Sequence, residues 1–215
     1  MKACIFDLDG TLTDTVETLA YFVNAELAKY DMPAIPSEKF KIFTGDGARN
    51  LIRRALAFHG RKDEAPEDKI LQDYNAAYDA NFLYKCKIYD GICELVNELK
   101  ARGLKIAVVT NKPQGTAEKV VEHFFGAGTF EVVVGQREGF PIKPDPAGVF
   151  EVLEKLHLRK DECIYIGDTG TDMKTGKSAG LFTVGVLWGF RSKEEIEDAG
   201  ADVIVSQPSE ILRFV

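Results

Sequence analysis

The sequence predicts an α/β protein with a doubly wound, Rossmann-like parallel sheet and an inserted all-helical domain. From residue 92 onward, short apolar runs alternate with amphipathic helical patterns. This alternation is typical of a parallel sheet that helices cover on both faces. Residues 15–85 show helical patterns and no convincing strand. We therefore expect a sheet domain formed by 1–14 and 86–215, and a helical domain formed by 15–85.

The first predicted strand is Ala3–Phe6, which stops at Asp7-Leu8-Asp9-Gly10. Alternate side chains of a strand share a face, so Asp7 and Asp9 are expected to point to the same side where the strand ends. Two carboxylates this close repel each other unless a cation lies between them or one of them is protonated. The motif therefore indicates a metal site, an acid/base pair or both, although a solvated Asp/Gly turn has the same residues.

The remaining elements follow from periodicity and from helix start and stop signals. The helical domain is expected to contain helices around 16–27, 51–56 and 70–78, joined by loops at 33–36, 44–47 and 61–67. In the sheet domain, apolar runs predict strands at 106–110, 132–134, 163–166, 182–186 and 203–205. Helices are expected between them at 92–99, 116–125, 147–156, 171–179 and 192–198.

Composition narrows the class of protein. The 215 residues are 45% hydrophobic and 28% charged, as in an ordinary globular protein. The net charge is −7 and no Lys/Arg run forms a basic face, which argues against a nucleic-acid partner. No apolar run approaches the roughly 20 residues of a membrane span, and the four cysteines form no C-x-x-C pair. We expect a cytoplasmic monomer or homodimer with reduced thiols and no membrane partner.

Polar residues follow each of the first four predicted strands of the sheet. In doubly wound sheets, ligands bind beyond the carboxyl ends of the strands, so these positions are expected to meet. In chain order they are Asp7 and Asp9, Thr110 and Asn111, Lys143, and Asp168 and Asp172. Side chains with chemical capability at four successive strand ends indicate one composite site rather than a set of solvated turns.

The chemistry of these residues suits phosphoryl transfer. Asp168 and Asp172 are four apart and lie close together if a helix starts near Gly170. With Asp7 and Asp9 they make an oxygen-only cluster, which favours Mg²⁺ over zinc. Lys143 adds a fixed positive charge. A carboxylate nucleophile whose charge is screened by a metal and a lysine is a known device of covalent catalysis.

These residues resemble the four ordered motifs of the haloacid dehalogenase superfamily of aspartate-nucleophile phosphohydrolases. The motifs are Asp7-Leu8-Asp9-Gly10-Thr11, Thr110-Asn111, Lys143 within Lys-Pro-Asp-Pro, and Gly167-Asp168-Thr169-Gly170-Thr171-Asp172. The resemblance spans nearly the whole chain. It implies an enzyme that hydrolyses phosphate monoesters with Mg²⁺ through an aspartyl-phosphate.

The resemblance also implies a role for each matched residue. Asp7 corresponds to the nucleophile, and Asp9 to the acid/base that protonates the leaving oxygen and then activates water. The Mg²⁺ ligands correspond to Asp7, the backbone carbonyl of Asp9 and Asp168, with Asp172 supporting that site. The phosphoryl oxygens are expected to contact Leu8, Thr110, Asn111 and Lys143.

The helical domain resembles the cap that closes over the site in this superfamily. Its hinges are expected at Thr13–Thr15 and Lys85–Tyr89. The cap positions expected to contact the substrate are Gly45, Asp46, Gly47 and Arg49.

Three strings are similar to phosphoglycolate phosphatases, and they favour 2-phosphoglycolate among small phosphorylated metabolites. The strings are 43–49, 109–113 and 187–191, the last with Trp188, which is interpreted as a packing residue. Pyrophosphatase, nucleotidase and β-phosphoglucomutase of the same superfamily stay open as alternatives. A phospho-accepting signalling receiver is disfavoured, because receivers lack a helical insertion after the first strand.

Overall fold

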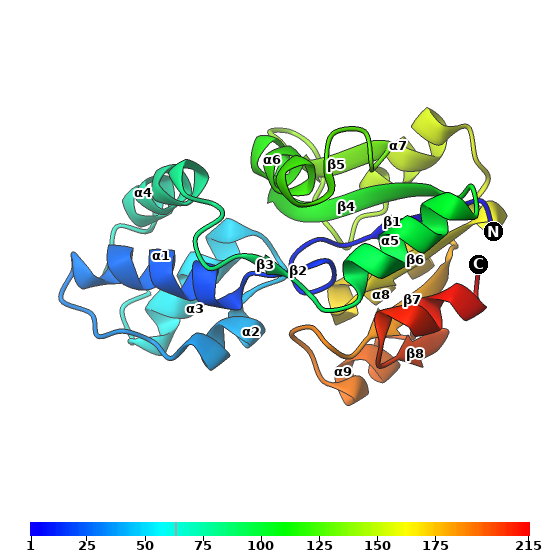
Figure 1. Ribbon diagram of the computed structural model, residues 1–215. Coiled ribbons are helices and arrows are strands. Elements are labelled where there is room, and N and C mark those ends of the chain that lie inside the picture. The colour runs from blue at the N-terminus through cyan, green and yellow to red at the C-terminus, as the bar shows by residue number, and fades with distance from the viewer. Residues whose placement is uncertain (63) are drawn as a thin grey trace. The chain divides into compact units, whose positions relative to one another are not determined.

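The computed structural model describes residues 1–62 and 64–215, and its chain divides into two compact units. The larger unit is formed by Met1–Asp14 and Ile88–Val215, and the smaller by Thr15–Lys87. Figure 1 labels the elements of both units along the chain. Residue 63, inside the predicted loop 61–67, lies outside the described residues.

A parallel sheet of six strands forms the centre of the larger unit, in the order β5-β4-β1-β6-β7-β8. The strands are β1 (Ala3–Phe6), β4 (Lys105–Pro113), β5 (Val132–Gln136), β6 (Cys163–Gly167), β7 (Phe182–Val186) and β8 (Val203–Val205). Cys4 of β1 lies opposite Ile106 of β4 and Ile164 of β6, so the first strand of the sequence is central in the sheet. Every residue of β1 and β6 is buried, which explains their apolar runs without alternation. The predicted doubly wound sheet is confirmed.

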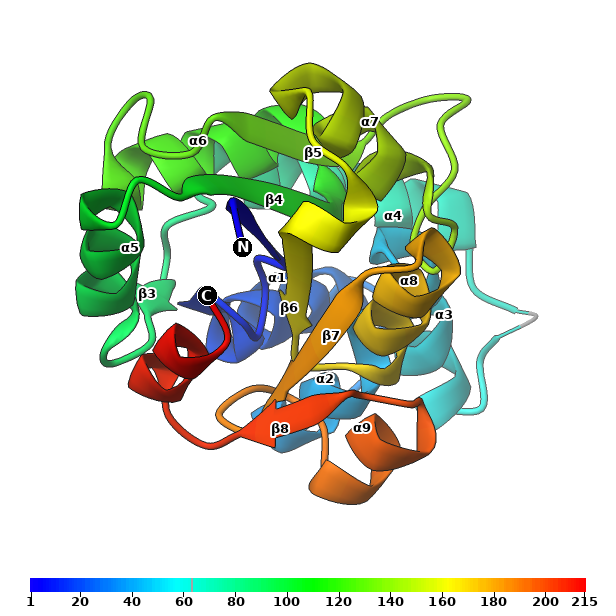
Figure 2. The ribbon, with the colours of Figure 1, turned by 90° about the vertical axis from the view of Figure 1, so that its right-hand side faces the viewer.

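Helices cover both faces of this sheet. They are α5 (Ile92–Ala101), α6 (Gln114–Phe125), α7 (Ala147–Leu156), α8 (Gly170–Ala179) and α9 (Lys193–Asp198), with 3-10 turns η1 (Lys160–Glu162) and η2 (Pro208–Arg213). Figure 2 shows α7 and α8 on one side of the strands, and α5 with η2 on the other. Ile5, Val109, Val149 and Tyr165 belong to one buried cluster, which joins three central strands to α7. This core fixes the strand ends where the site is built.

In its described residues, the smaller unit contains the helices α1 (Val16–Ala28), α2 (Ser37–Phe43), α3 (Ala48–Phe58) and α4 (Glu67–Ala80). All but α2 bury several apolar residues, for example Leu51, Ile52, Ala55 and Leu56 of α3. The sequence pattern does not predict α2, because its seven residues bury only Phe40 and so show no helical period. Among the described residues, no helix of either unit has both the length and the apolar character of a membrane span.

The two segments that connect the units pair as a small sheet. Its strands are β2 (Thr13–Asp14) and β3 (Lys87–Ile88), each of two residues. Strands this short cannot show an alternating pattern, so the sequence predicts neither. These segments coincide with the predicted hinges, whose movement stays a prediction.

Candidate active site

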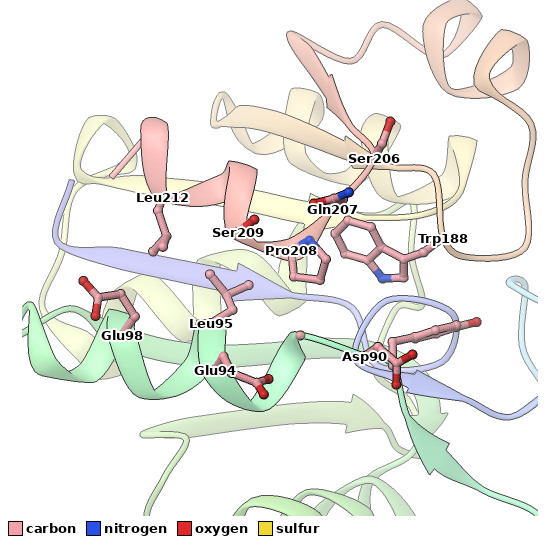
Figure 3. A pocket seen from close by; sticks show the side chains of 12 residues that line it. Asp90, Glu94, Leu95, Glu98, Trp188, Ser206, Gln207, Pro208, Ser209 and Leu212 are labelled. Carbon is pink, nitrogen blue, oxygen red and sulfur yellow. The ribbon is translucent and has the colours of Figure 1, made fainter.

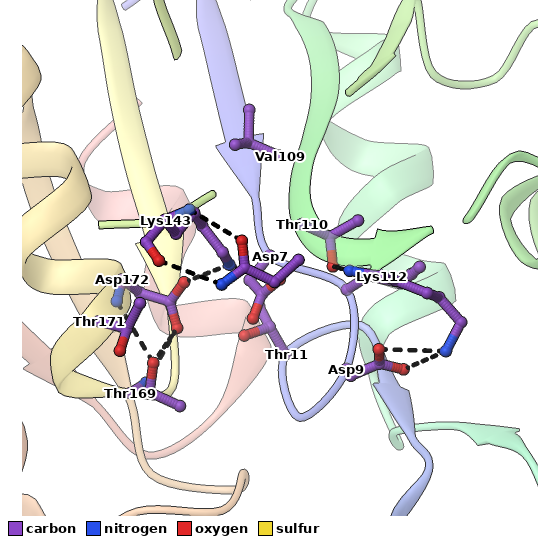
Figure 4. Close-up of polar contacts among 12 residues, drawn as sticks. Asp7, Asp9, Thr11, Val109, Thr110, Lys112, Lys143, Thr169, Thr171 and Asp172 are labelled. Atoms are coloured by element: carbon purple, nitrogen blue, oxygen red, sulfur yellow. Dashed lines mark hydrogen bonds and ion pairs between the residues drawn. The ribbon is translucent and has the colours of Figure 1, made fainter. Parts of the chain in front are cut away.

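The site residues meet at the carboxyl edge of the central strands. Asp7 directly follows β1, Thr110 and Asn111 lie near the end of β4, and Asp168 directly follows β6. Because β1 pairs with both β4 and β6, the ends of these three strands are neighbours. Figure 4 shows Asp7, Lys143 and Asp172 close together there, with Thr110 to one side.

Three buried carboxylates form a close group at this edge. Asp7, Asp168 and Asp172 each contribute an oxygen, and these oxygens lie within 4.8 Å of one another. Asp168 is fixed by the Thr11 hydroxyl, which donates to its Oδ1 at 2.8 Å, and by the Phe190 N–H, which donates to its Oδ2 at 2.8 Å. The group is thus held in place from loops that follow two different strands.

The first turn of α8 positions Asp172. Thr169 caps this helix, and its N–H and hydroxyl donate to Asp172 Oδ2 at 3.0 and 2.7 Å. The other oxygen, Oδ1, accepts from Lys143 Nζ at 2.7 Å and from the Tyr165 hydroxyl at 3.4 Å. Asp172 therefore has little freedom to rotate and acts as a fixed negative charge beside Lys143.

Lys143 is buried between two carboxylates. Its Nζ lies 2.8 Å from Asp7 Oδ1 and 2.7 Å from Asp172 Oδ1. Asn111 holds the backbone of Lys143 from both sides, because its side-chain oxygen accepts from the Lys143 N–H at 2.8 Å and its amide donates to the Lys143 carbonyl at 3.2 Å. The predicted phosphate-binding pair Asn111 and Lys143 is therefore one hydrogen-bonded unit.

The charges of the three carboxylates and Lys143 favour the binding of a further cation. Burial and the neighbouring Asp172 raise the pKa of Asp7 to about 7, against the opposing effect of Lys143. Burial and the charges of Asp172 and Asp7 raise the pKa of Asp168 well above its ordinary value. Burial acts to lower the pKa of Lys143, but the same two carboxylates outweigh it and raise that pKa. One ammonium among three carboxylates leaves a net negative site.

A divalent cation fits this site. Asp7 Oδ1 is buried, with Lys143 Nζ 2.8 Å away. One lysine does not neutralise three carboxylates, so a further cation is favoured beside them. The three carboxylates offer only oxygen donors, the set that Mg²⁺ prefers. Asp7, Asp168 and Asp172 could therefore hold a metal ion.

Asp9 lies apart from the three-carboxylate group. Its Oδ1 and Oδ2 accept from Lys112 Nζ at 2.9 and 3.1 Å, as Figure 4 shows. The Lys112 N–H in turn donates to the Thr110 hydroxyl at 3.2 Å. The sequence motifs do not predict Lys112 as a site residue. The available signal is a lysine at the end of an otherwise apolar strand, directly after Thr110-Asn111.

The loop after β1 is tight, and a hydrogen bond joins it to the loop after β7. The Leu8 carbonyl accepts from the N–H groups of Leu12 and Thr13 at 3.0 and 2.9 Å. The indole N–H of Trp188 donates to the Thr11 carbonyl at 2.9 Å. Trp188 is thus more than a packing residue, because it ties the loop after β7 to the loop that carries Asp9.

A separate pocket of about 730 Å³ lies beside α5 and η2. Figure 3 shows that Glu94, Leu95 and Glu98 of α5 line one side of it, opposite Pro208 and Leu212. None of the three clustered carboxylates lines this pocket. Trp188 and Tyr89 connect it to the loop after β1, since the Tyr89 N–H donates to the Leu12 carbonyl at 3.3 Å, but the clustered carboxylates lie outside it.

The predicted cap residues all lie in the smaller unit, where Arg49 and Asp46 form ion pairs. Arg49 Nη1 lies 2.8 Å from Glu67 and 2.7 Å from Asp68. Asp46 forms an ion pair with Arg54. Gly45 and Gly47 have positive φ values of 114° and 85°, as expected of the loop before α3. Contact of these residues with a substrate stays a prediction.

Comparison with known proteins agrees with the fold and the motifs. The model of the haloacid dehalogenase-like hydrolase family matches residues 4–186. A phosphoglycolate phosphatase of Rhodospirillum rubrum is 35% identical over 205 residues, which cover 93% of this chain and 85% of that protein. One of Haemophilus influenzae is 29% identical and covers 98% and 96%.

Solved structures show the same architecture. A structure from Lactobacillus delbrueckii subsp. bulgaricus has a TM-score of 0.91 at 31% identity and covers 98% of this chain and 96% of that one. A predicted phosphoglycolate phosphatase from Haemophilus somnus has a TM-score of 0.89 at 26% identity, with 100% and 97% covered. The chain therefore belongs to the haloacid dehalogenase-like hydrolases. Its similarity to phosphatases within that family identifies it as a phosphatase.

Proposed function

We propose that the protein is a Mg²⁺-dependent phosphomonoesterase that works through phosphorylation of Asp7. The observation that carries this proposal is the buried group of Asp7, Asp168 and Asp172 with Lys143 bonded between two of its members. Such a group combines a nucleophilic carboxylate with fixed charges that can hold a phosphoryl group. When bound, Mg²⁺ would neutralise charge on the carboxylates and on the phosphoryl oxygens.

In the first half-reaction, a carboxylate oxygen of Asp7 attacks phosphorus while the bond from phosphorus to the ester oxygen breaks. Asp9 gives its proton to the departing oxygen, so the alcohol leaves neutral. Lys143 and the Thr110 hydroxyl hold phosphoryl oxygens during this transfer. Asn111 acts by fixing the backbone of Lys143.

In the second half-reaction, Asp9 takes a proton from water as the water oxygen attacks phosphorus. The bond from phosphorus to the Asp7 oxygen breaks, which releases inorganic phosphate and restores the Asp7 carboxylate. Asp9 then carries the proton needed for the next cycle. Lys112 holds the Asp9 carboxylate in position between these steps.

We propose 2-phosphoglycolate as the substrate. The support is that relatives spanning most of this chain are phosphoglycolate phosphatases, at 35% and 29% identity. The smaller unit is proposed as the cap that selects the substrate, with Gly45, Asp46, Gly47 and Arg49 as its contact residues. The Asp9 carbonyl is proposed as a further metal ligand and the Leu8 backbone as a phosphate contact.

The test is phosphate release in Mg²⁺ from 2-phosphoglycolate, pyrophosphate, a nucleoside monophosphate and β-glucose 1-phosphate. We expect 2-phosphoglycolate to be preferred, and we expect Asp7→Asn to lose at least about 10³-fold in activity, because the nucleophile is gone. Asp90→Asn, an exposed aspartate on the same unit, is the matched control and should keep full activity. Full activity in Asp7→Asn would contradict the mechanism, whereas a preference for another phosphate would contradict only the substrate.

A further inference from the structure

Lys112 is a second buried lysine of the site, and neither the motifs nor the proposed metal group accounts for it. Only 3% of its side chain is exposed. Removing an ammonium from water is costly, so such a group is paired or has a ligand to bind. Its ammonium pairs with Asp9, whose side chain is 15% exposed and so lies nearer the accessible part of the site.

The two lysines divide the site into two ends. Lys143 lies with Asp7 and Asp172, the end where the phosphoryl group is to be held. Lys112 lies with Asp9, whose proposed task is to protonate the ester oxygen of the leaving group. A substituent next to that ester oxygen on the leaving group therefore comes close to Lys112, whereas Lys143 contacts the phosphoryl group. Lys112 is the cation of the leaving-group end.

From this position we propose that Lys112 is a specificity-determining residue, which binds a carboxylate on the carbon that carries the ester oxygen. The preferred substrates are then phosphates of 2-hydroxy acids, of which 2-phosphoglycolate is the smallest. The proposal rests on the proposed function, because it uses Asp9 as the acid of the first half-reaction. It assigns the recognition of the substrate's carboxylate to Lys112 of the larger unit, in addition to the substrate contacts proposed for the cap residues.

One ammonium can serve both partners at once. It carries three N–H donors, and Lys143 contacts two different carboxylates with the same kind of group. Lys112 is also held at its backbone by the Thr110 hydroxyl, so its side chain leaves a fixed point of β4. It can therefore keep Asp9 in place while it binds a substrate carboxylate beside it.

The simpler reading is that Lys112 only positions Asp9. That role would affect every phosphate ester equally, because Asp9 acts on the ester oxygen whatever the leaving group is. The proposed role affects only esters that carry the carboxylate. The ratio of kcat/KM between two substrates that differ only in this group separates the two roles.

The experiment compares 2-phosphoglycolate with its neutral amide, glycolamide phosphate, in the wild type and in Lys112→Met. We expect the wild type to prefer the acid, and the ratio of kcat/KM for acid over amide to fall by about 30-fold or more in the variant, the effect of a lost charge-assisted hydrogen bond. Lys112→Arg, which keeps the charge, should retain part of the ratio. Lys174→Met, at an exposed lysine of α8, should leave it unchanged.

An equal loss on both substrates in Lys112→Met would overturn the proposal and leave Lys112 as a residue that positions Asp9. A wild type that treats acid and amide alike would overturn it as well. Both results are distinct from failure of the proposed function, which is read from activity that survives in Asp7→Asn. Should Lys112→Met not fold, as judged by its melting curve, Lys112→Gln supplies the same ratio with a polar neutral side chain.

Discussion

Ion pairs of buried or partly buried residues have two different roles in this protein, one at the site and one in the fold. Lys143 and Lys112 are buried with carboxylates around the site, where pairing prevents an unneutralised charge and positions reacting groups. Asp202 shows a structural use of the same interaction. Its Oδ2 accepts from the Thr183 N–H and hydroxyl at 2.8 and 2.9 Å, and its Oδ1 pairs with Lys177. Asp202 thereby joins the turn before β8 to β7 and to α8.

Asp202 should make stability depend on pH. Burial acts to raise its pKa, but the hydrogen bonds from Lys177 and Thr183 outweigh burial and lower that pKa. A lowered pKa means that the stabilisation is present above the unfolded-state pKa, about 4, and is lost as the pH falls through the folded-state pKa. We expect Asp202→Asn to reduce the free energy of unfolding by about 1 kcal/mol at pH 7.

Urea unfolding of wild type and Asp202→Asn at pH values from 7 down to 3 would measure this effect. The difference between the two proteins should shrink toward the acid end. Asp161→Asn is the control, since Asp161 is exposed and its ion pair with Arg159 lies on the surface. A difference for Asp202→Asn that stays constant over this range would show that its hydrogen-bonding shape matters and its charge does not.

Much of the candidate site was predictable at the scale of residues, because strand ends in a doubly wound sheet meet at one edge. That rule brings together Asp7, Asp168, Asp172 and Lys143 in both the prediction and the structure. It does not say which polar neighbours pair. The contacts of Lys112 with Asp9 and of Trp188 with Thr11 join residues more than a hundred positions apart, and no local pattern contains such distances.

The loops at the strand ends are packed against one another as closely as the strands are. Gly189, in the loop after β7, shows this most clearly. A Cβ on Gly189 would lie 2.4 Å from Asp168 Cβ and 2.4 Å from the Gly10 carbonyl oxygen. Gly10 itself has φ +95°, and a Cβ there would meet Asp168 Oδ2 at 2.3 Å. The loops after β1 and β7 thus approach Asp168 so closely that only glycine fits at positions 10 and 189.

Gly189→Ala should therefore displace Asp168. We expect kcat/KM to fall at least tenfold, and the free energy of unfolding to fall by about 2 kcal/mol, the usual range for overpacking. Gly115→Ala is a matched control, because a Cβ on Gly115 meets nothing within 4 Å and the residue lies in helix α6. The control should be neutral or slightly stabilising. Phosphate release and urea unfolding of both variants would check this, and equal behaviour of the two would refute the packing argument.

Elements with a full period were predictable, and short ones were not. The strands and helices of the sheet domain are predicted to within a few residues, since each has an apolar run or stripe that packs in the core. The sequences of helix α2 and of strands β2 and β3 show no such apolar run or stripe. Two-residue strands form because their chain segments are brought together, and that cause lies outside the segments themselves.

On the scale of the whole molecule, the buried carboxylates proposed for catalysis lower the stability of the folded state. Asp7, Asp168 and Asp172 repel each other in the folded chain, and this repulsion is relieved only in part by Lys143. Without a divalent cation the folded state carries that cost. A bound cation would relieve it and would stabilise the folded state by mass action, by about 2.7 kcal/mol at a concentration one hundred times Kd.

We therefore expect the order of melting temperatures to depend on metal. In EDTA, Asp7→Asn should melt higher than the wild type, because one of three repelling charges is removed. In millimolar Mg²⁺ the wild type should gain more, so the difference should shrink or reverse. Differential scanning calorimetry in both buffers measures this, with Asp90→Asn as the control. Equal effects of Mg²⁺ on the two proteins would argue against Asp7 as a ligand.

The central position of β1 also has a consequence for how the protein is made. The strand that precedes Asp7 is synthesised first, yet the strands that flank it in the sheet, β4 and β6, begin only at Lys105 and Cys163. Thr11 and its partner Asp168 are 157 positions apart, which corresponds to about 8 to 30 s of translation at typical rates. For most of that interval the apolar strand β1 has no neighbour, and after β4 is synthesised it still lacks β6 on its other side. The nascent chain is thus inactive until β6 has emerged, and its earliest segment is the one that most needs protection from aggregation.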